Sequence, residues 1–154
     1  MFRPHPEVHA YLTWRFEPVT SLVREIRERA DPASRIHVID LKDGCLGGCD
    51  IAALGRVCDG AILCAYDMPP EAVGALMRGG RAAPGRGKFL GAGFRLFYPE
   101  MSGPEVLTAC VLAAAAAGVD GTNFYDYGLV PAARLDWMRQ AVDAVSARRQ
   151  GRPK

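Results

Sequence analysis

Apolar residues recur at helical spacings along the first part of the chain. Between Val8 and Ala30 they follow one another largely at steps of three and four positions, which places them on one face of an α-helix. Pro18 falls inside this segment, and a proline either kinks a helix or begins a new one. The spacing therefore predicts a leading helix over residues 8–30, with an interruption near Pro18.

Four short apolar runs follow this segment, and each ends in polar residues. The runs are rich in β-branched or aromatic side chains, which is typical of strands. They lie at residues 36–39, 61–67, 89–98 and 119–125. Helical spacings follow them at residues 51–57, 70–77, 105–117 and from Pro131 onward. The runs begin roughly 25–30 residues apart, the length of a βα unit, so we predict an α/β domain: a leading helix and then a parallel (βα)4 sheet.

The connection at residues 79–88, GGRAAPGRGK, is rich in glycine and arginine. A phosphate-binding loop and a solvated connector are both consistent with this composition. The stretch lacks the GxxxxGK[ST] pattern and precedes a strand rather than a helix, which favours the connector. No GxGxxG follows the first predicted strand, so the sequence does not favour a dinucleotide-binding domain.

Polar and aromatic side chains stand where each predicted strand ends. Because the carboxyl ends of parallel strands meet at one edge of a sheet, we expect these side chains to share a site. Aromatic rings pack on the apolar face of a pyranose, and carboxylates act on glycosidic bonds as acid, base or nucleophile. We therefore predict a carbohydrate site built from Asp40, Tyr66, Asp67, Tyr98, Glu100, Asn123, Tyr125 and Asp126.

Each carboxylate in this set also has a purely structural interpretation. Glu100 stands just before a predicted helix, where negative charge is favoured by the helix dipole. Asp126 is able to cap a turn, and Asp40 and Asp67 are residues that commonly lead into helices. The three histidines do not cluster in the sequence, and we assign none of them a role.

The segments FYPE at 97–100, GVDGTNFYDYG at 118–128 and LDWM at 135–138 carry a family resemblance. They resemble the last two strands of glycoside-hydrolase-like TIM barrels, the family-10-like hypothetical hydrolases. The segment from Tyr11 to Ile26 is similar to the helix after strand four of the same barrels. The resemblance implies that the chain covers strands five to eight of a TIM barrel.

The resemblance also implies a division of catalytic roles. Glu100 corresponds in placement to the nucleophile at the end of strand seven, whereas the acid/base group lies at the end of strand four, which this chain lacks. A single carboxylate cannot both protonate a leaving group and attack the sugar. We therefore expect a glycosidase-type protein that acts on carbohydrate and is inactive alone.

Composition bounds the remaining function classes. The chain has 154 residues, of which 49% are hydrophobic and 23% charged, and its formal net charge is +2. This balance gives no electrostatic reason to expect nucleic acid or a membrane surface as a partner. The longest apolar run, 106–119, is shorter than the ~20 residues that cross a bilayer, and the N-terminus has no signal-peptide core. We expect a cytoplasmic domain over residues 1–147 and a disordered basic tail over 148–154.

Two of the five cysteines, Cys45 and Cys49, form a C-x3-C in a glycine-rich loop. A metal or redox pair and two unrelated thiols are the alternative interpretations. No second pair of ligands stands nearby to complete a zinc site, so we expect no metal and no cofactor.

Three functional hypotheses remain open from the sequence. The first is the hydrolase-derived half-barrel described above. The second is a non-catalytic module that associates through unpaired strand edges, either with a second copy or with a missing amino-terminal half-barrel. The third is a small flavodoxin-like α/β protein that uses Asp40 and Asp67 at its strand ends.

Overall fold

The computed structural model describes residues 5–41, 47–85, 87–96 and 101–150. Helices and strands alternate along most of the chain, as the sequence predicts. In order, the elements are α1 (Pro6–Trp14), α2 (Phe16–Arg29), β1 (His37–Asp40), α4 (Ile51–Leu54), β2 (Gly60–Cys64), α5 (Pro70–Ala82), β3 (Phe89–Arg95), α6 (Pro104–Ala116), β4 (Gly121–Tyr125), the short 3-10 helix η1 (Tyr127–Leu129) and α7 (Ala133–Gln150).

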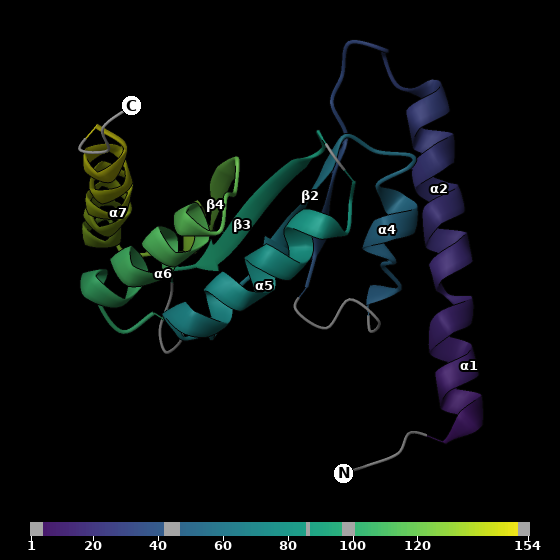
Figure 1. Ribbon diagram of the computed structural model, residues 1–154, viewed down its shortest axis with the longest axis horizontal. Coiled ribbons are helices and arrows are strands. Elements are labelled where there is room, and N and C mark those ends of the chain that lie inside the picture. The colour runs from purple at the N-terminus through teal and green to yellow at the C-terminus, as the bar shows by residue number, and fades with distance from the viewer. Residues whose placement is uncertain (1–4, 42–46, 86, 97–100, 151–154) are drawn as a thin grey trace.

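The predicted leading helix consists of two consecutive helices, α1 and α2, that run nearly end to end (Figure 1). The interruption is at Arg15, and Pro18 lies in the first turn of α2. Proline is tolerated in a first turn because the backbone N–H that it lacks has no partner there anyway. The backbone hydrogen bonds resume with Val19, whose N–H donates to the Arg15 carbonyl at 3.4 Å.

The sheet is parallel throughout, and its strands lie in chain order, β1-β2-β3-β4. A sequential order requires each βα connection to step to the next position on the same side, as it does in barrels. In a flavodoxin-like sheet the order reverses around the first strand, and this sheet does not do so. The fold is therefore α/β with a (βα)4 order of the half-barrel type.

One face of the sheet is covered by helices, with α5 and α6 lying side by side over it (Figure 1). Alternate residues of the strands point into this layer and form the core with both helices. The core side chains with the least exposure include Leu90, Phe94, Val73, Met77, Leu107 and Val111. Burying each large aliphatic or aromatic side chain contributes about 1.5–3 kcal/mol, so this layer supplies most of the stability.

Helix α5 is longer than the sequence predicts, because it continues through Gly79 and Gly80 to Ala82. A Cβ on Gly80 would overlap the Leu63 side chain of β2. Glycine here is therefore a site of close helix–sheet approach, and the helix ends only after it. The expected connector is correspondingly shorter than residues 79–88.

The other face of the sheet has no helix packed on it among the described residues. Its side chains follow from the register, in which Cys64 pairs with Gly93 and Arg95 with Tyr125. Among the large hydrophobic side chains that strands carry on this face, Ile39 is 60% exposed and Tyr125 is 46% exposed. This open face, together with the outer edges of β1 and β4, is where the architecture is least covered.

The last helix, α7, packs against α6 and buries Ala141 (Figure 1). It continues through Gln150, so residues 148–150 of the expected tail are helical, and residues 151–154 lie outside the described ranges. No helix within the described ranges combines the length and the apolar character needed to cross a lipid bilayer.

Candidate functional site at the carboxyl edge of the sheet

Three side chains from neighbouring strands meet at the carboxyl edge of the sheet, on its open face. The guanidinium carbon of Arg95 lies 4.5 Å from the centre of the Tyr66 ring, in cation–π geometry. The rings of Tyr66 and Tyr125 are 6.4 Å apart between centroids and inclined by 28°. The strand register explains the meeting, because Arg95 and Tyr125 are paired across β3 and β4. We call these three residues the Tyr–Arg–Tyr cluster.

Tyr66 is the member of the cluster that contacts both of the others. Its half-buried position raises the pKa of the phenol above its ordinary value, and the hydrogen bond with Cys64 raises it further, whereas Arg95 opposes the shift. The hydroxyl group therefore stays protonated at neutral pH. The cluster therefore places two neutral tyrosine rings beside one guanidinium group at this edge of the sheet.

The remaining described candidates around the cluster differ in how they are held. Asn123 is exposed and pairs in register with Gly93, which places its amide on the open face below Tyr125. Asp67 is exposed and has a left-handed backbone, with φ of +56°. Asp126 accepts a hydrogen bond from the Gly128 N–H at 2.9 Å and caps η1. The capping interpretation of Asp126 thus has a direct structural counterpart.

Asp40 lies on the helix-covered face and is not part of the cluster. Its register partner is Leu63, whose side chain packs against Gly80 of α5. Asp40 is 7% exposed, and burial raises the pKa of its carboxyl group, an effect that a hydrogen bond from Cys49 partly offsets. Conversely, burial and the neighbouring Asp40 raise the pKa of Cys49 to about 11. Asp40 and Cys49 therefore form a separate pair behind the sheet.

Several predicted residues lie outside the described ranges. They are Tyr98, the catalytic candidate Glu100, and Cys45 of the C-x3-C segment. Among the residues that are described, no group of three or more His, Cys, Asp or Glu side chains is arranged to hold a metal ion.

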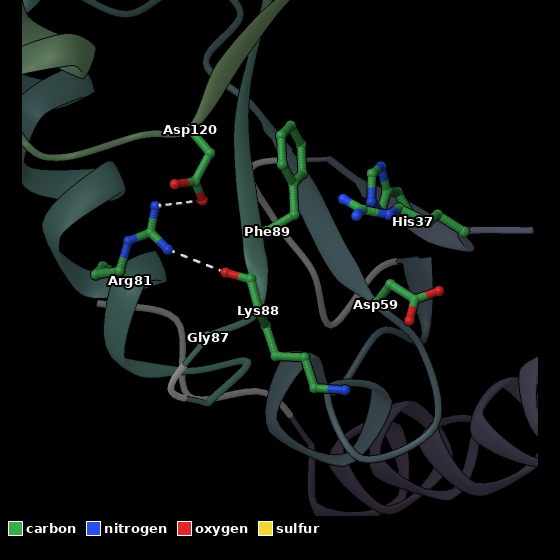
Figure 2. A pocket seen from close by; sticks show the side chains of 8 residues that line it. His37, Asp59, Arg81, Gly87, Lys88, Phe89 and Asp120 are labelled. Atoms are coloured by element: carbon green, nitrogen blue, oxygen red, sulfur yellow. Dashed lines mark hydrogen bonds and ion pairs between the residues drawn. The ribbon is translucent and has the colours of Figure 1, made fainter. Parts of the chain in front are cut away.

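The opposite, amino edge of the sheet contains a cavity of about 630 Å³ (Figure 2). The rings of His37 and Phe89 stack in it at 4.4 Å between centroids. Two carboxylates line it, and both are engaged in holding strands together. Asp120 accepts a hydrogen bond from the Leu90 N–H at 2.8 Å and forms an ion pair with Arg81 at 2.8 Å. Asp59 accepts a hydrogen bond from the Ile36 N–H at 2.7 Å and forms an ion pair with Arg27. The two carboxylates of this cavity are therefore structural groups.

Arg95 is the member of the cluster that sequence reasoning missed. It was absorbed into the apolar run 89–98, although it stands alone as a charge between Phe94 and Leu96. A single arginine in a buried parallel strand is costly unless one face of the sheet is open at that point. This is the signal by which the sequence could have identified it.

Comparison with protein-family models, with curated proteins and with solved structures gives no match for this chain.

Proposed function

We propose that this chain binds carbohydrate at the Tyr–Arg–Tyr cluster and descends from a glycoside-hydrolase-like barrel. The observation that supports the proposal is the packing of the Tyr66 ring against both Tyr125 and Arg95 on an open sheet face. Aromatic rings cover the apolar face of a pyranose, and a guanidinium group donates to hydroxyl oxygens in a fixed geometry. Exposed Asn123 adds both donors and acceptors beside the rings.

Binding without hydrolysis is the activity we propose for the chain alone. Hydrolysis requires two carboxyl groups on opposite sides of the glycosidic bond, about 5–10 Å apart. Of the three described aspartate candidates, Asp40 faces the helix layer and Asp126 caps η1, which leaves Asp67 as a single exposed carboxylate. Glu100 stays a prediction from the sequence as the nucleophile, and the resemblance implies that its acid/base partner belongs to strand four of such a barrel.

Calorimetric titration with a panel of neutral oligosaccharides tests this proposal. We expect saturable binding to at least one of them, and no release of reducing sugar over the same period. Tyr125→Ala should weaken the affinity roughly two- to tenfold, since ring packing contributes about 0.5–1.5 kcal/mol beyond buried area.

The matched control is Tyr11→Ala, which removes another exposed tyrosine, 58% exposed, from α1 at a distance from the cluster. This variant should bind as the parent does. Absence of binding to the whole panel, or equal losses in the two variants, would reject a carbohydrate site at the cluster.

A further inference from the structure

The sheet is built from two similar halves. In each half three groups form one ring of contacts: a helix arginine, a backbone N–H within one residue of the start of the next strand, and an aspartate just before the strand after that. The N–H of Asp59 donates to the Ile36 carbonyl at 2.8 Å, and the N–H of Asp120 donates to the Leu90 carbonyl at the same distance. Each aspartate also accepts the reciprocal hydrogen bond and binds an arginine.

The same repeat is visible in the sequence once the structure aligns it. Arg27 precedes Ile36 by nine residues, Arg81 precedes Leu90 by nine, and a glycine follows each aspartate directly. The unit α2-β1-α4-β2 is therefore equivalent to the unit α5-β3-α6-β4. In this alignment β4 is the counterpart of β2, and β1 is the counterpart of β3.

The repeat identifies what the outer edge of β4 is shaped to pair with. The edge of β2 pairs with β3, and in that register Cys64 stands opposite Gly93. The equivalent residues are Tyr125 on β4 and Ile39 on β1. The outer edge of β4 is therefore equivalent to the edge of β2 that pairs with β3. A strand equivalent to β1 fits this edge of β4, and the outer edge of β1 in turn fits a strand equivalent to β4.

In the part of the chain that the structure describes, the helices and loops that directly precede or follow these two edge strands carry exposed apolar side chains. Beside β1, Leu41 is 57% exposed, and Leu22 and Ile26 of α2 are 58% and 48% exposed. Beside β4, Leu129 is 66% and Val142 of α7 is 45% exposed. Unpaired strand edges next to apolar side chains are surfaces that associate.

We infer that a second copy of this chain pairs with both edges and closes the sheet. A twofold axis along the strand direction places β4 of each copy beside β1 of the other, with all strands parallel. Tyr125 then stands opposite Ile39 of the second copy, which covers both exposed side chains. The product is an eight-stranded barrel whose interior is the open face and whose mouth contains two Tyr–Arg–Tyr clusters.

Light scattering of the purified chain gives the first test. We expect twice the 16.6-kDa mass of the chain. Ile39→Lys should shift the mass to that of one chain, because it places a charge against Tyr125 of the second copy. The control Val106→Lys changes a side chain of α6 that is 38% exposed and lies away from both edges, and it should leave the dimer intact.

Cysteine crosslinking tests the register itself. Neighbouring strands are about 4.8 Å apart, within disulfide range, so Ile39→Cys combined with Tyr125→Cys should give a reducible dimer on oxidation. Within one copy β2 and β3 separate these positions, which excludes an internal bridge. Ile39→Cys with Thr122→Cys is the matched control and should not crosslink, because Thr122 pairs with Ala92 on the other face.

A chain that is monomeric at every concentration, or that associates without the 39–125 crosslink, overturns the inference. Aggregation without that crosslink counts as the second of these results. A chain that stays monomeric would mean that another unit covers the edges of β1 and β4. The inference does not rest on carbohydrate binding. A dimer that binds no sugar overturns only the proposed function, and a monomer that binds sugar overturns only the closed dimer.

Discussion

Arg81 and Asp120 are 39 residues apart in the chain, yet they form an ion pair at 2.8 Å at the amino edge of the sheet. The same carboxylate oxygen accepts the Leu90 N–H, so one aspartate ties α5 to the starts of β3 and β4. Arg81 also donates to the carbonyls of Lys88 and Gly118, at 3.0 and 2.6 Å. Arg81 and Asp120 thus connect the elements of the half α5-β3-α6-β4, as Arg27 and Asp59 connect those of the half α2-β1-α4-β2.

Replacement of Asp120 should destabilise the chain in a pH-dependent manner. The backbone hydrogen bond from Leu90, and then Arg81, lower the pKa of Asp120. A lowered pKa in the folded state contributes stability above the unfolded value of ~3.9, and this contribution is lost as the pH falls through the folded value. We expect Asp120→Asn to lower the free energy of unfolding by about 1 kcal/mol at pH 7, discounted for partial exposure, and by progressively less below pH ~4.

Urea denaturation at several pH values measures this difference. Asp136→Asn is the control, because Asp136 forms an exposed ion pair with Arg139 within α7 and accepts no hydrogen bond from a neighbouring strand. Its effect should stay below about 0.5 kcal/mol at every pH. Equal effects of the two substitutions would contradict the clamp that we assign to Asp120.

Two glycine substitutions should change stability in opposite directions. A Cβ on Gly60 would lie 2.6 Å from the Cβ of Phe89 and would overlap the Phe89 carbonyl oxygen in the neighbouring strand. Gly79 lies in α5 with nothing within 4 Å of its Cβ position. We expect Gly60→Ala to cost about 1–3 kcal/mol or more, and Gly79→Ala to stabilise the helix by about 0.5–1 kcal/mol.

The midpoint and slope of urea unfolding measure both effects on the same scale. Gly60→Ala with unchanged stability would mean that β2 and β3 are further apart than the register indicates. Gly79→Ala without any gain in stability would mean that the end of α5 is frayed in solution. The connector between α5 and β3 would then begin at residue 79, as the sequence predicts.

The order of strands and helices was predictable because each βα unit carries its own local pattern. Asp50, for example, stands just before the helical spacing of residues 51–57, where aspartate is a favoured cap, and it accepts the Ala53 N–H at 3.0 Å. The end of α5 was not predictable, because Gly80 has a helical role only through its contact with Leu63 across the interior. The sequence Ser102-Gly-Pro-Glu105 has the spacing of a capping box, but α6 begins after Gly103 without a side-chain cap.

The candidate site was predictable only in part. Tyr66 and Tyr125 come together as expected of strand ends, and this depends only on parallel order. Asp40 ends a strand too, but it faces the helix layer because alternate residues point to opposite sides. A choice between faces requires the register of the whole sheet, which no single segment specifies. Arg95, by contrast, has a local signal, because it is a single charge between Phe94 and Leu96 in an apolar run.

The thiol of Cys49 should react slowly with alkylating reagents. Its pKa of about 11 arises first from burial and then from the charge and hydrogen bond of Asp40, so about 1 in 1,000 molecules carries the thiolate at pH 8. Asp40→Asn removes the charge and should raise the alkylation rate several-fold, while burial keeps the rate below that of an exposed cysteine. Peptide-level mass spectrometry after iodoacetamide treatment measures the rate at this position.

Asp50→Asn is the matched control for that experiment. It removes a carboxylate from the residue next to Cys49, and asparagine caps helices as well as aspartate does, so α4 should persist. The alkylation rate in this variant should match the parent. A rate that is insensitive to Asp40→Asn would mean that the Asp40–Cys49 contact does not persist in solution.

Carbohydrate affinity at the Tyr–Arg–Tyr cluster should be nearly independent of pH between about 6 and 9. The pKa of Tyr66 is raised above its ordinary value by burial and by Cys64, so its hydroxyl does not ionise in this range. Guanidinium groups also keep their charge throughout. Calorimetric titration across this range measures the profile, and Tyr66→Phe should show the same flat profile with affinity within about twofold, because the ring supplies the packing. An inflection near pH 7 would instead assign the recognition to a titrating group outside the cluster.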